Sequence, residues 1–112
     1  MGREAADIAR RAAEIIQERG MCKGAVSDAD GRVCLWGALL EAAQERGLGW
    51  YGDRGVQPLL AEAIRPLNLD NMSQFDGLLY GAAWNDRPET DERDVAKVLL
   101  QVADRLEIGG AA

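Results

Sequence analysis

The seven residues 82–88, AAWNDRP, place four different side-chain chemistries next to one another. Trp84 offers an aromatic face, and Asn85 offers an amide that both donates and accepts hydrogen bonds. Asp86 adds a carboxylate and Arg87 a guanidinium. Because binding groups commonly sit on loops that a rigid scaffold holds in place, these four residues are candidate binding residues.

A second cluster of this kind lies in the glycine-rich segment 48–55, LGWYGDRG. Trp50, Tyr51 and Arg54 in this segment could form a wall opposite the first cluster. Aromatic side chains beside arginine and asparagine suit either a protein-binding hot spot or a stacked base. The sequence therefore allows two kinds of binding site: a surface for a partner protein, or a nucleotide-sized pocket between the Trp50 and Trp84 loops.

A purely structural interpretation accounts for the same residues 82–88. Asparagine, aspartate and proline are typical of turns, and Pro88 biases the residue before it towards an extended backbone. Trp84 would then be the last core residue of one helix, and the segment would be the joint to the next helix. The sequence leaves the binding and joint interpretations both open.

The chain offers little for nucleophilic catalysis, because it contains no histidine. Such catalysis needs an activated hydroxyl, thiol or amine beside a base. The hydroxyl groups of Ser27, Ser73 and Thr90 occupy expected turn or cap positions, and no imidazole is present to activate them. We therefore identify no catalytic residue of this type.

Carboxylates are the remaining candidates for acid–base chemistry. The pairs Asp28/Asp30 and Asp91/Asp94 stand out, but such pairs arise by chance in a chain with 19 acidic residues. Acidic residues at the start of a helix also favour the helix dipole. An enzyme that uses carboxylates is therefore the third-ranked function, behind the two kinds of binding protein.

Two metal-site interpretations fail on their ligands. The thiols of Cys22 and Cys34 fall short of the roughly four Cys/His ligands of a structural zinc site. A calcium loop that starts at Asp28 would need glycine and glutamate where the chain has Val33 and Leu39. We expect no metal and no cofactor. The cysteines are expected to be reduced, buried thiols, with a disulfide between them as the alternative.

The net charge of −6 disfavours binding to nucleic acid, because phosphate groups are bound by basic surfaces. No apolar run approaches the ~20 residues that cross a bilayer, so no membrane association is expected. The first residues, MGREAADIARR, lack the apolar core of a secretory signal. These features predict a cytoplasmic protein.

Hydrophobic periodicity predicts a mainly α, compact single domain over residues 1–112, with about five helices. A short β-hairpin is expected after the first helix, around a turn at residues 28–31. Residues 109–112 are expected to be a frayed tail. The expected helices cover residues 4–19, 33–46, 59–65, 71 or 73 to 84, and 91–107.

Single residues carry further expectations about these helices. Gly20 suits the left-handed position after the first helix, and Gly37 would let another backbone approach closely. Trp36 is expected in the centre of the core, and Thr90 as the N-cap of the last helix. Leu100 lies off the apolar stripe of the last helix, which indicates a second buried side or a subunit contact.

Three segments, ERGMCKGA, DGRVCLWGALLEAA and AAWNDRPETDERDV, follow one another in the chain. Together they resemble a family of short proteins of unknown function from high-GC bacteria and their phages. The resemblance implies no activity and no catalytic residue, but it suggests a phage product that binds a host factor. We therefore expect a non-enzymatic protein–protein interaction module. Its partner would be a host protein or a second copy of the chain, as in a homodimer, and a small-ligand binder is the alternative.

Overall fold

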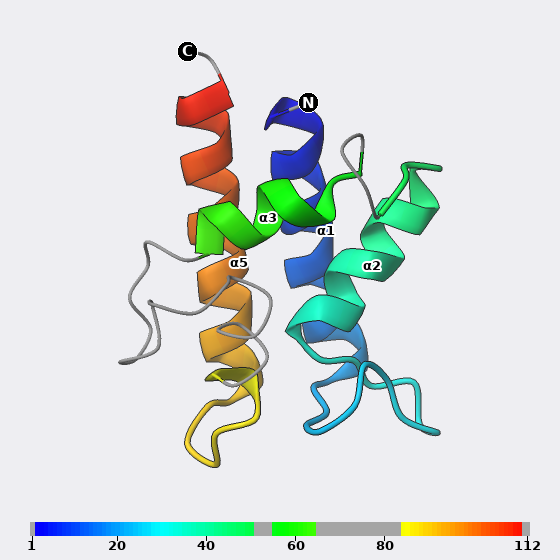
Figure 1. Ribbon diagram of the computed structural model, residues 1–112. Coiled ribbons are helices and arrows are strands. Elements are labelled where there is room, and N and C mark those ends of the chain that lie inside the picture. The colour runs from blue at the N-terminus through cyan, green and yellow to red at the C-terminus, as the bar shows by residue number, and fades with distance from the viewer. Residues whose placement is uncertain (1, 51–54, 65–83, 111–112) are drawn as a thin grey trace.

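The computed structural model describes residues 2–50, 55–64 and 84–110 of the chain (Figure 1). The mainly α prediction is confirmed, although these residues contain four helices rather than five. The helix that was expected to reach Trp84 lies almost entirely outside the described residues. The helices are α1 (Gly2–Arg19), α2 (Leu35–Glu45), α3 (Gln57–Ile64) and α5 (Glu92–Gly110).

Helices α1 and α5 lie side by side and antiparallel, so the start of α1 and the end of α5 lie at the same end of the molecule (Figure 1). Apolar residues at helical spacing allow this packing. Ile8 and Ile15 of α1 are fully buried, as are Val95 and Leu99 of α5. Because α1 also packs against α2 and α3, it is the central element of the core.

The helix ends follow the glycine and proline signals of the sequence. Gly20 follows α1 with a φ of 87°, and Gly47 follows α2 with a φ of 68°, a conformation that glycine adopts without strain. Pro58 lies in the first turn of α3, where a missing N–H costs no helical hydrogen bond. Helix α5 continues to Gly110, past its expected end at Glu107.

Helix α2 confirms two expectations about single residues. Trp36 is 5% exposed and belongs to the core. Gly37 meets the loop that follows α1, because a Cβ atom built on Gly37 would lie 2.1 Å from the carbonyl oxygen of Val26. The close approach of two backbones at this glycine is therefore a property of the fold.

The β-hairpin that was expected after α1 is wrong. Its turn is present, because Asp28 Oδ1 accepts a hydrogen bond from the backbone N–H of Arg32 at 3.0 Å. In this fully described segment, however, Val33 makes only isolated bridges, antiparallel with Ser27 and parallel with Met21. Strands of about three residues are too short to hold a two-stranded ladder, and contacts with the rest of the fold shape this loop instead.

The start of α5 corrects another expectation, since Asp91 and not Thr90 is the N-cap. Asp91 Oδ1 accepts from the backbone N–H of Asp94 at 3.0 Å, and Asp94 Oδ2 accepts from the backbone N–H of Asp91 at 3.1 Å. These reciprocal bonds form a capping box. The Thr90 hydroxyl donates instead to the carbonyl oxygen of Trp84 at 2.8 Å.

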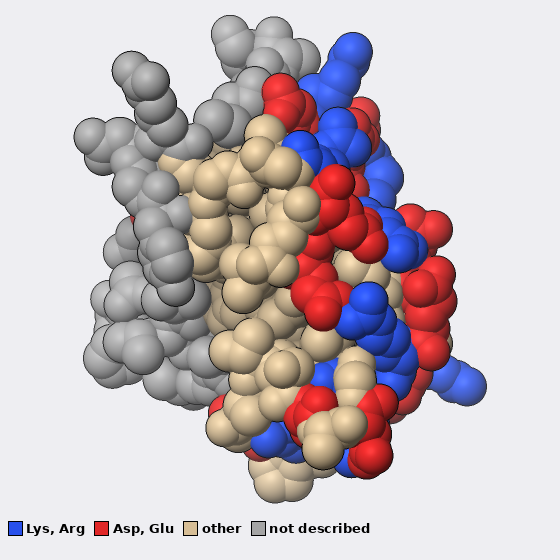
Figure 2. Space-filling view, turned by 90° about the vertical axis from the view of Figure 1, so that its right-hand side faces the viewer, with Lys and Arg blue, Asp and Glu red and all other residues tan. Residues whose placement is uncertain are grey.

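Basic and acidic side chains intermingle along one side of the molecule (Figure 2). Two ion pairs join α1 to α2: Arg11 Nε lies 2.8 Å from Glu45 Oε1, and Arg19 pairs with Glu41. Exposed pairs of this kind contribute little individually. None of the described helices is both long and apolar enough to cross a membrane.

Candidate functional site

The segment 84–90 is tied to two other parts of the chain through Asn85. The Asn85 side chain is buried, with the residue 1% exposed. Its Oδ1 accepts from the backbone N–H of Leu35 at 2.9 Å, and its Nδ2 donates to the carbonyl oxygen of Cys22 at 3.1 Å. A buried amide with both ends satisfied fixes the position of its partners. Asn85 thus holds the loop after α1 and the start of α2 against the segment before α5.

Lys23, in the loop after α1, binds the same segment. Its ammonium group donates to the carbonyl oxygens of Asn85 at 2.8 Å and Thr90 at 2.7 Å, and also to that of Arg87. An ammonium group has three donors, so these three carbonyls use all of them. The bonds hold the turn of segment 84–90 in one shape.

Asp86 completes the connection to the loop after α1. Asp86 Oδ1 accepts from the backbone N–H of Gly24 at 2.9 Å and from Asn85 Nδ2 at 3.1 Å. These contacts agree with the interpretation of AAWNDRP as a joint between helices, because the polar groups of the segment form hydrogen bonds within the protein. Asp86 and Arg87 nevertheless keep exposed surface, so the segment also presents groups to solvent.

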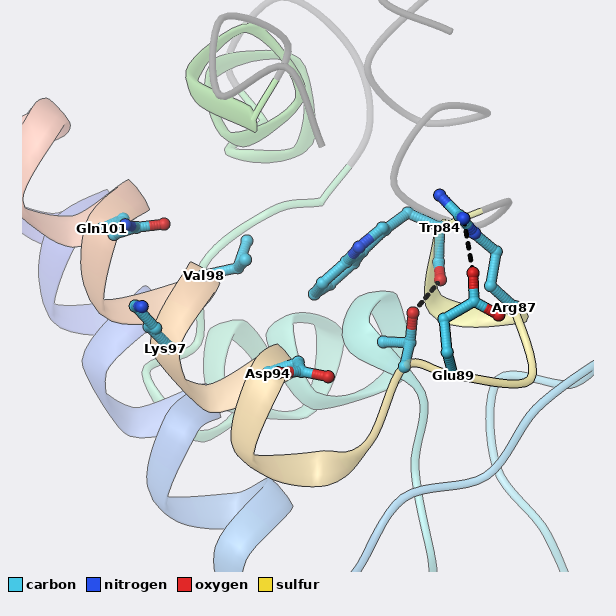
Figure 3. A pocket seen from close by; sticks show the side chains of 8 residues that line it. Trp84, Arg87, Glu89, Asp94, Lys97, Val98 and Gln101 are labelled. Atoms are coloured by element: carbon cyan, nitrogen blue, oxygen red, sulfur yellow. Dashed lines mark hydrogen bonds and ion pairs between the residues drawn. The ribbon is translucent and has the colours of Figure 1, made fainter. Parts of the chain in front are cut away.

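A cavity of about 390 Å³ lies between segment 84–90 and α5 (Figure 3); we call it the α5 cavity. The indole of Trp84 forms one wall and points towards Val98 of α5. The segment and the helix face each other across this space. Charged and polar side chains from both also line it: Arg87, Glu89, Asp94, Lys97 and Gln101.

The charges around the α5 cavity differ in how they are paired. Arg87 pairs with Glu89, and Asp94 is part of the capping box. A hydrogen bond from its own backbone, and then the Arg87 guanidinium, lower the pKa of the Glu89 carboxyl. Lys97 has no ion-pair partner among the described residues, so its charge is available to a ligand.

A second cavity, of about 300 Å³, is formed by the loop after α1, the start of α2 and segment 84–90; we call it the loop cavity. Val26 and Trp36 give it apolar walls, together with the Cys34 thiol. Asp86 contributes a carboxylate. The loop cavity is thus mainly apolar with one acidic group.

The structure describes only part of the two predicted clusters of binding residues. Trp50 packs edge-to-face on Trp36, with ring centroids 6.2 Å apart and an interplanar angle of 76°. Trp84 lines the α5 cavity, and Trp50 is not among the residues that line it. Tyr51 and Arg54 lie outside the described residues. A pocket between the Trp50 and Trp84 loops therefore stays a prediction.

Both cysteines are free thiols with structural contacts. Cys34 Sγ accepts from the backbone N–H of Gly37 at 3.3 Å as the N-cap of α2, and Cys22 Sγ donates to the carbonyl oxygen of Ala25 at 3.3 Å. Burial raises the pKa of both thiols, because an apolar environment disfavours the thiolate. Neither thiol is activated as a nucleophile in this setting.

A comparison with protein families finds a match. Residues 1–105 match a family of unknown function, DUF6197. The chain belongs to this family. No curated protein and no solved structure matches the chain. Because the function of DUF6197 is unknown, membership assigns no activity to any residue.

No sequence pattern marks Lys97 or Gln101 as site residues in this DUF6197 member. Lys97 and Gln101 stand four residues apart, a spacing that puts them on one face of a helix, but exposed polar residues at this spacing are ordinary. Lys97 and Gln101 are candidate site residues because the fold brings Trp84 to the same face of α5. No pattern in the sequence indicates that contact.

Proposed function

We propose that the protein is a non-enzymatic module that binds a partner protein at the α5 cavity. The observation that carries this proposal is the indole of Trp84, 8% exposed, which lines the cavity beside charged groups of both signs. Tryptophan and arginine are enriched where protein interfaces gain most of their affinity. Charged groups around such a centre select and orient the partner.

The contacts of segment 84–90 support the same proposal. Asn85 and Lys23 fix the backbone that carries Trp84 and Arg87, so a partner would meet a surface already in its bound shape. A surface of this kind loses less conformational entropy on binding. The joint and binding interpretations are therefore compatible. Asn85 and Thr90 build the joint, whereas the exposed residues 86–89 and the accessible edge of Trp84 would meet the partner.

We propose a host protein in the cytoplasm as the partner, and a phage origin for the chain. The resemblance of its three segments to proteins of high-GC bacteria and their phages supports this. A second copy of the chain is the other candidate partner. Leu100 supports a homodimer because it is 47% exposed on α5. The net charge of −6 argues against nucleic acid as the partner.

The test is affinity capture from an extract of the native host with matched charge reversals. Lys97→Glu reverses the charge at the α5 cavity, and Arg3→Glu reverses an exposed charge on α1. We expect the wild type and Arg3→Glu to retain the same partner and Lys97→Glu to lose it. Equal recovery with all three proteins would contradict the proposal.

A small, nucleotide-like ligand is the second candidate. The α5 cavity, of about 390 Å³, is within the range of small-ligand sites, and an indole can stack on a base. Thermal unfolding with a panel of nucleotides tests it, because a ligand that binds only the native state raises the melting temperature. A rise that Lys97→Glu abolishes would support the ligand, and no rise with any nucleotide would exclude it.

An enzyme that uses carboxylates is the third candidate function. Asp28 accepts hydrogen bonds within its own turn and pairs with Arg32. Asp91 and Asp94 cap α5. The carboxylate pairs that the sequence suggested thus have structural partners, and among the described residues no three potential metal ligands gather.

A further inference from the structure

The loop cavity is lined by groups that the proposed protein surface at the α5 cavity does not use. Val26 is 51% exposed although it is a large apolar residue, and it lines this cavity together with Trp36. Exposed apolar side chains beside a concave surface are typical of binding sites. The loop cavity does not include Lys97 or Gln101, so it is separate from the α5 cavity.

The carboxylate of Asp86 is held in a fixed orientation at this cavity. Its Oδ1 accepts two hydrogen bonds, from the backbone N–H of Gly24 and from Asn85 Nδ2. Its Oδ2 has no hydrogen-bond partner among the described residues. One oxygen thus anchors the group, and the other is available to a ligand.

The ammonium group of Lys23 forms no hydrogen bond with the Asp86 carboxylate, although it binds the same segment. Its ammonium group donates to the carbonyl oxygens of Asn85, Arg87 and Thr90. These bonds occupy all three of its donors. In the described part of the chain, no basic side chain forms an ion pair with Asp86.

We propose that the loop cavity binds a small primary ammonium ion with an apolar body. The ammonium group would donate to Asp86 Oδ2, a charge-assisted hydrogen bond. The apolar body would lie between Val26 and Trp36, where it removes apolar surface from water. The indole of Trp36, 5% exposed, gives this part of the cavity an aromatic wall. This ligand accounts for both the exposed Val26 and the free carboxylate oxygen.

Phenethylamine is the probe, and it is compared by isothermal titration calorimetry with two analogues of similar shape. Phenylethanol lacks the charge and phenylpropionate reverses it. We expect phenethylamine to bind the wild type at least about tenfold more tightly than either analogue, because only the ammonium can form a charge-assisted bond with Asp86. Equal affinity for phenylethanol, or no binding of phenethylamine, would overturn the proposal.

Three variants locate the site. Asp86→Asn removes the charge but keeps an acceptor for Gly24, and Val26→Lys places a positive charge at an exposed position of the cavity wall. Both should weaken phenethylamine binding about tenfold or more. Asp104→Asn removes an exposed charge on α5, away from the loop cavity, and should bind as the wild type does. An equal loss in Asp104→Asn, or full binding by Val26→Lys, would contradict the site.

Discussion

At the scale of single residues, the side chain of Asn85 connects three segments that are distant in the sequence. It pairs with the backbone of Cys22 and of Leu35 from a position just before α5. Each of these backbone groups would lose a buried partner if the amide were removed. The same small group therefore positions both cavities, since segment 84–90 lines each of them.

Replacing Asn85 by alanine should destabilise the protein by about 2–4 kcal/mol, since it leaves a buried donor and a buried acceptor unpaired. Urea unfolding followed by circular dichroism measures the change. Gln44→Ala removes an exposed amide from α2 and should alter the unfolding free energy by less than about 0.5 kcal/mol. Similar values for the two variants would show that the Asn85 contacts are not formed.

The two thiols should react slowly with Ellman's reagent, because burial raises the pKa of Cys22 and of Cys34 and the thiolate is the reactive form. At pH 8 the folded protein should react about tenfold or more slowly than the chain in guanidinium. The same shift makes stability fall as the pH rises above the ordinary thiol pKa of about 8.5. A fast reaction of the folded protein would contradict the burial of these groups.

At the scale of elements, helix positions were largely predictable and their contacts were not. The apolar stripe of α1, with Gly20 after it, gives the helix and its end from the sequence alone. The expected hairpin does not form because long-range contacts, the backbone approach at Gly37 and the amide of Asn85, shape this loop, and neither contact has a local sequence signal. The α5 cavity could not be predicted, because Trp84 and Lys97 are brought together by packing and not by any spacing.

Gly37→Ala tests the closest contact between two elements. Alanine favours a helix over glycine by about 1 kcal/mol, but its Cβ would meet the carbonyl oxygen of Val26 at 2.1 Å. Because backbone must move, we expect a net loss of about 1–3 kcal/mol in urea unfolding. Gly49→Ala is the control, since a Cβ at Gly49 has no atom within 4 Å. A stabilised Gly37→Ala variant would refute this contact.

The pairing of α1 with α2 should depend on pH through Glu45. Its hydrogen bond to Arg11, followed by their charge attraction, holds the pKa of the Glu45 carboxyl below its usual value. This contribution is present above the ordinary glutamate pKa of about 4.3 and is lost as the pH falls below it.

Melting temperatures measured between pH 7 and pH 3 test the effect of this pair. Glu45→Gln should lose less stability on acidification than the wild type does. Glu4→Gln, which removes an exposed acid of α1, should keep the acid dependence of the wild type. Identical acid profiles for wild type and Glu45→Gln would contradict the role of the pair.

At the scale of the whole molecule, the helices form a scaffold with two separate cavities. Residues of segment 84–90 line both of them. The α5 cavity has charges of both signs around an indole, and the loop cavity is mainly apolar with one carboxylate. Because their chemistries differ, we propose a partner protein as the ligand of the first and a small ammonium ion as the ligand of the second.

Site-specific photo-crosslinking tests the central proposal most directly. A benzoylphenylalanine is placed at Gln101, which lines the α5 cavity, or at Gln17, an exposed residue of α1. After irradiation in extract of the native host, we predict one protein crosslinked from position 101 and absent from position 17. Adding excess unlabelled wild-type protein should remove the crosslink, whereas adding the same amount of Lys97→Glu should not. No specific crosslink from position 101, or the same product from both positions, would contradict a binding surface at this cavity.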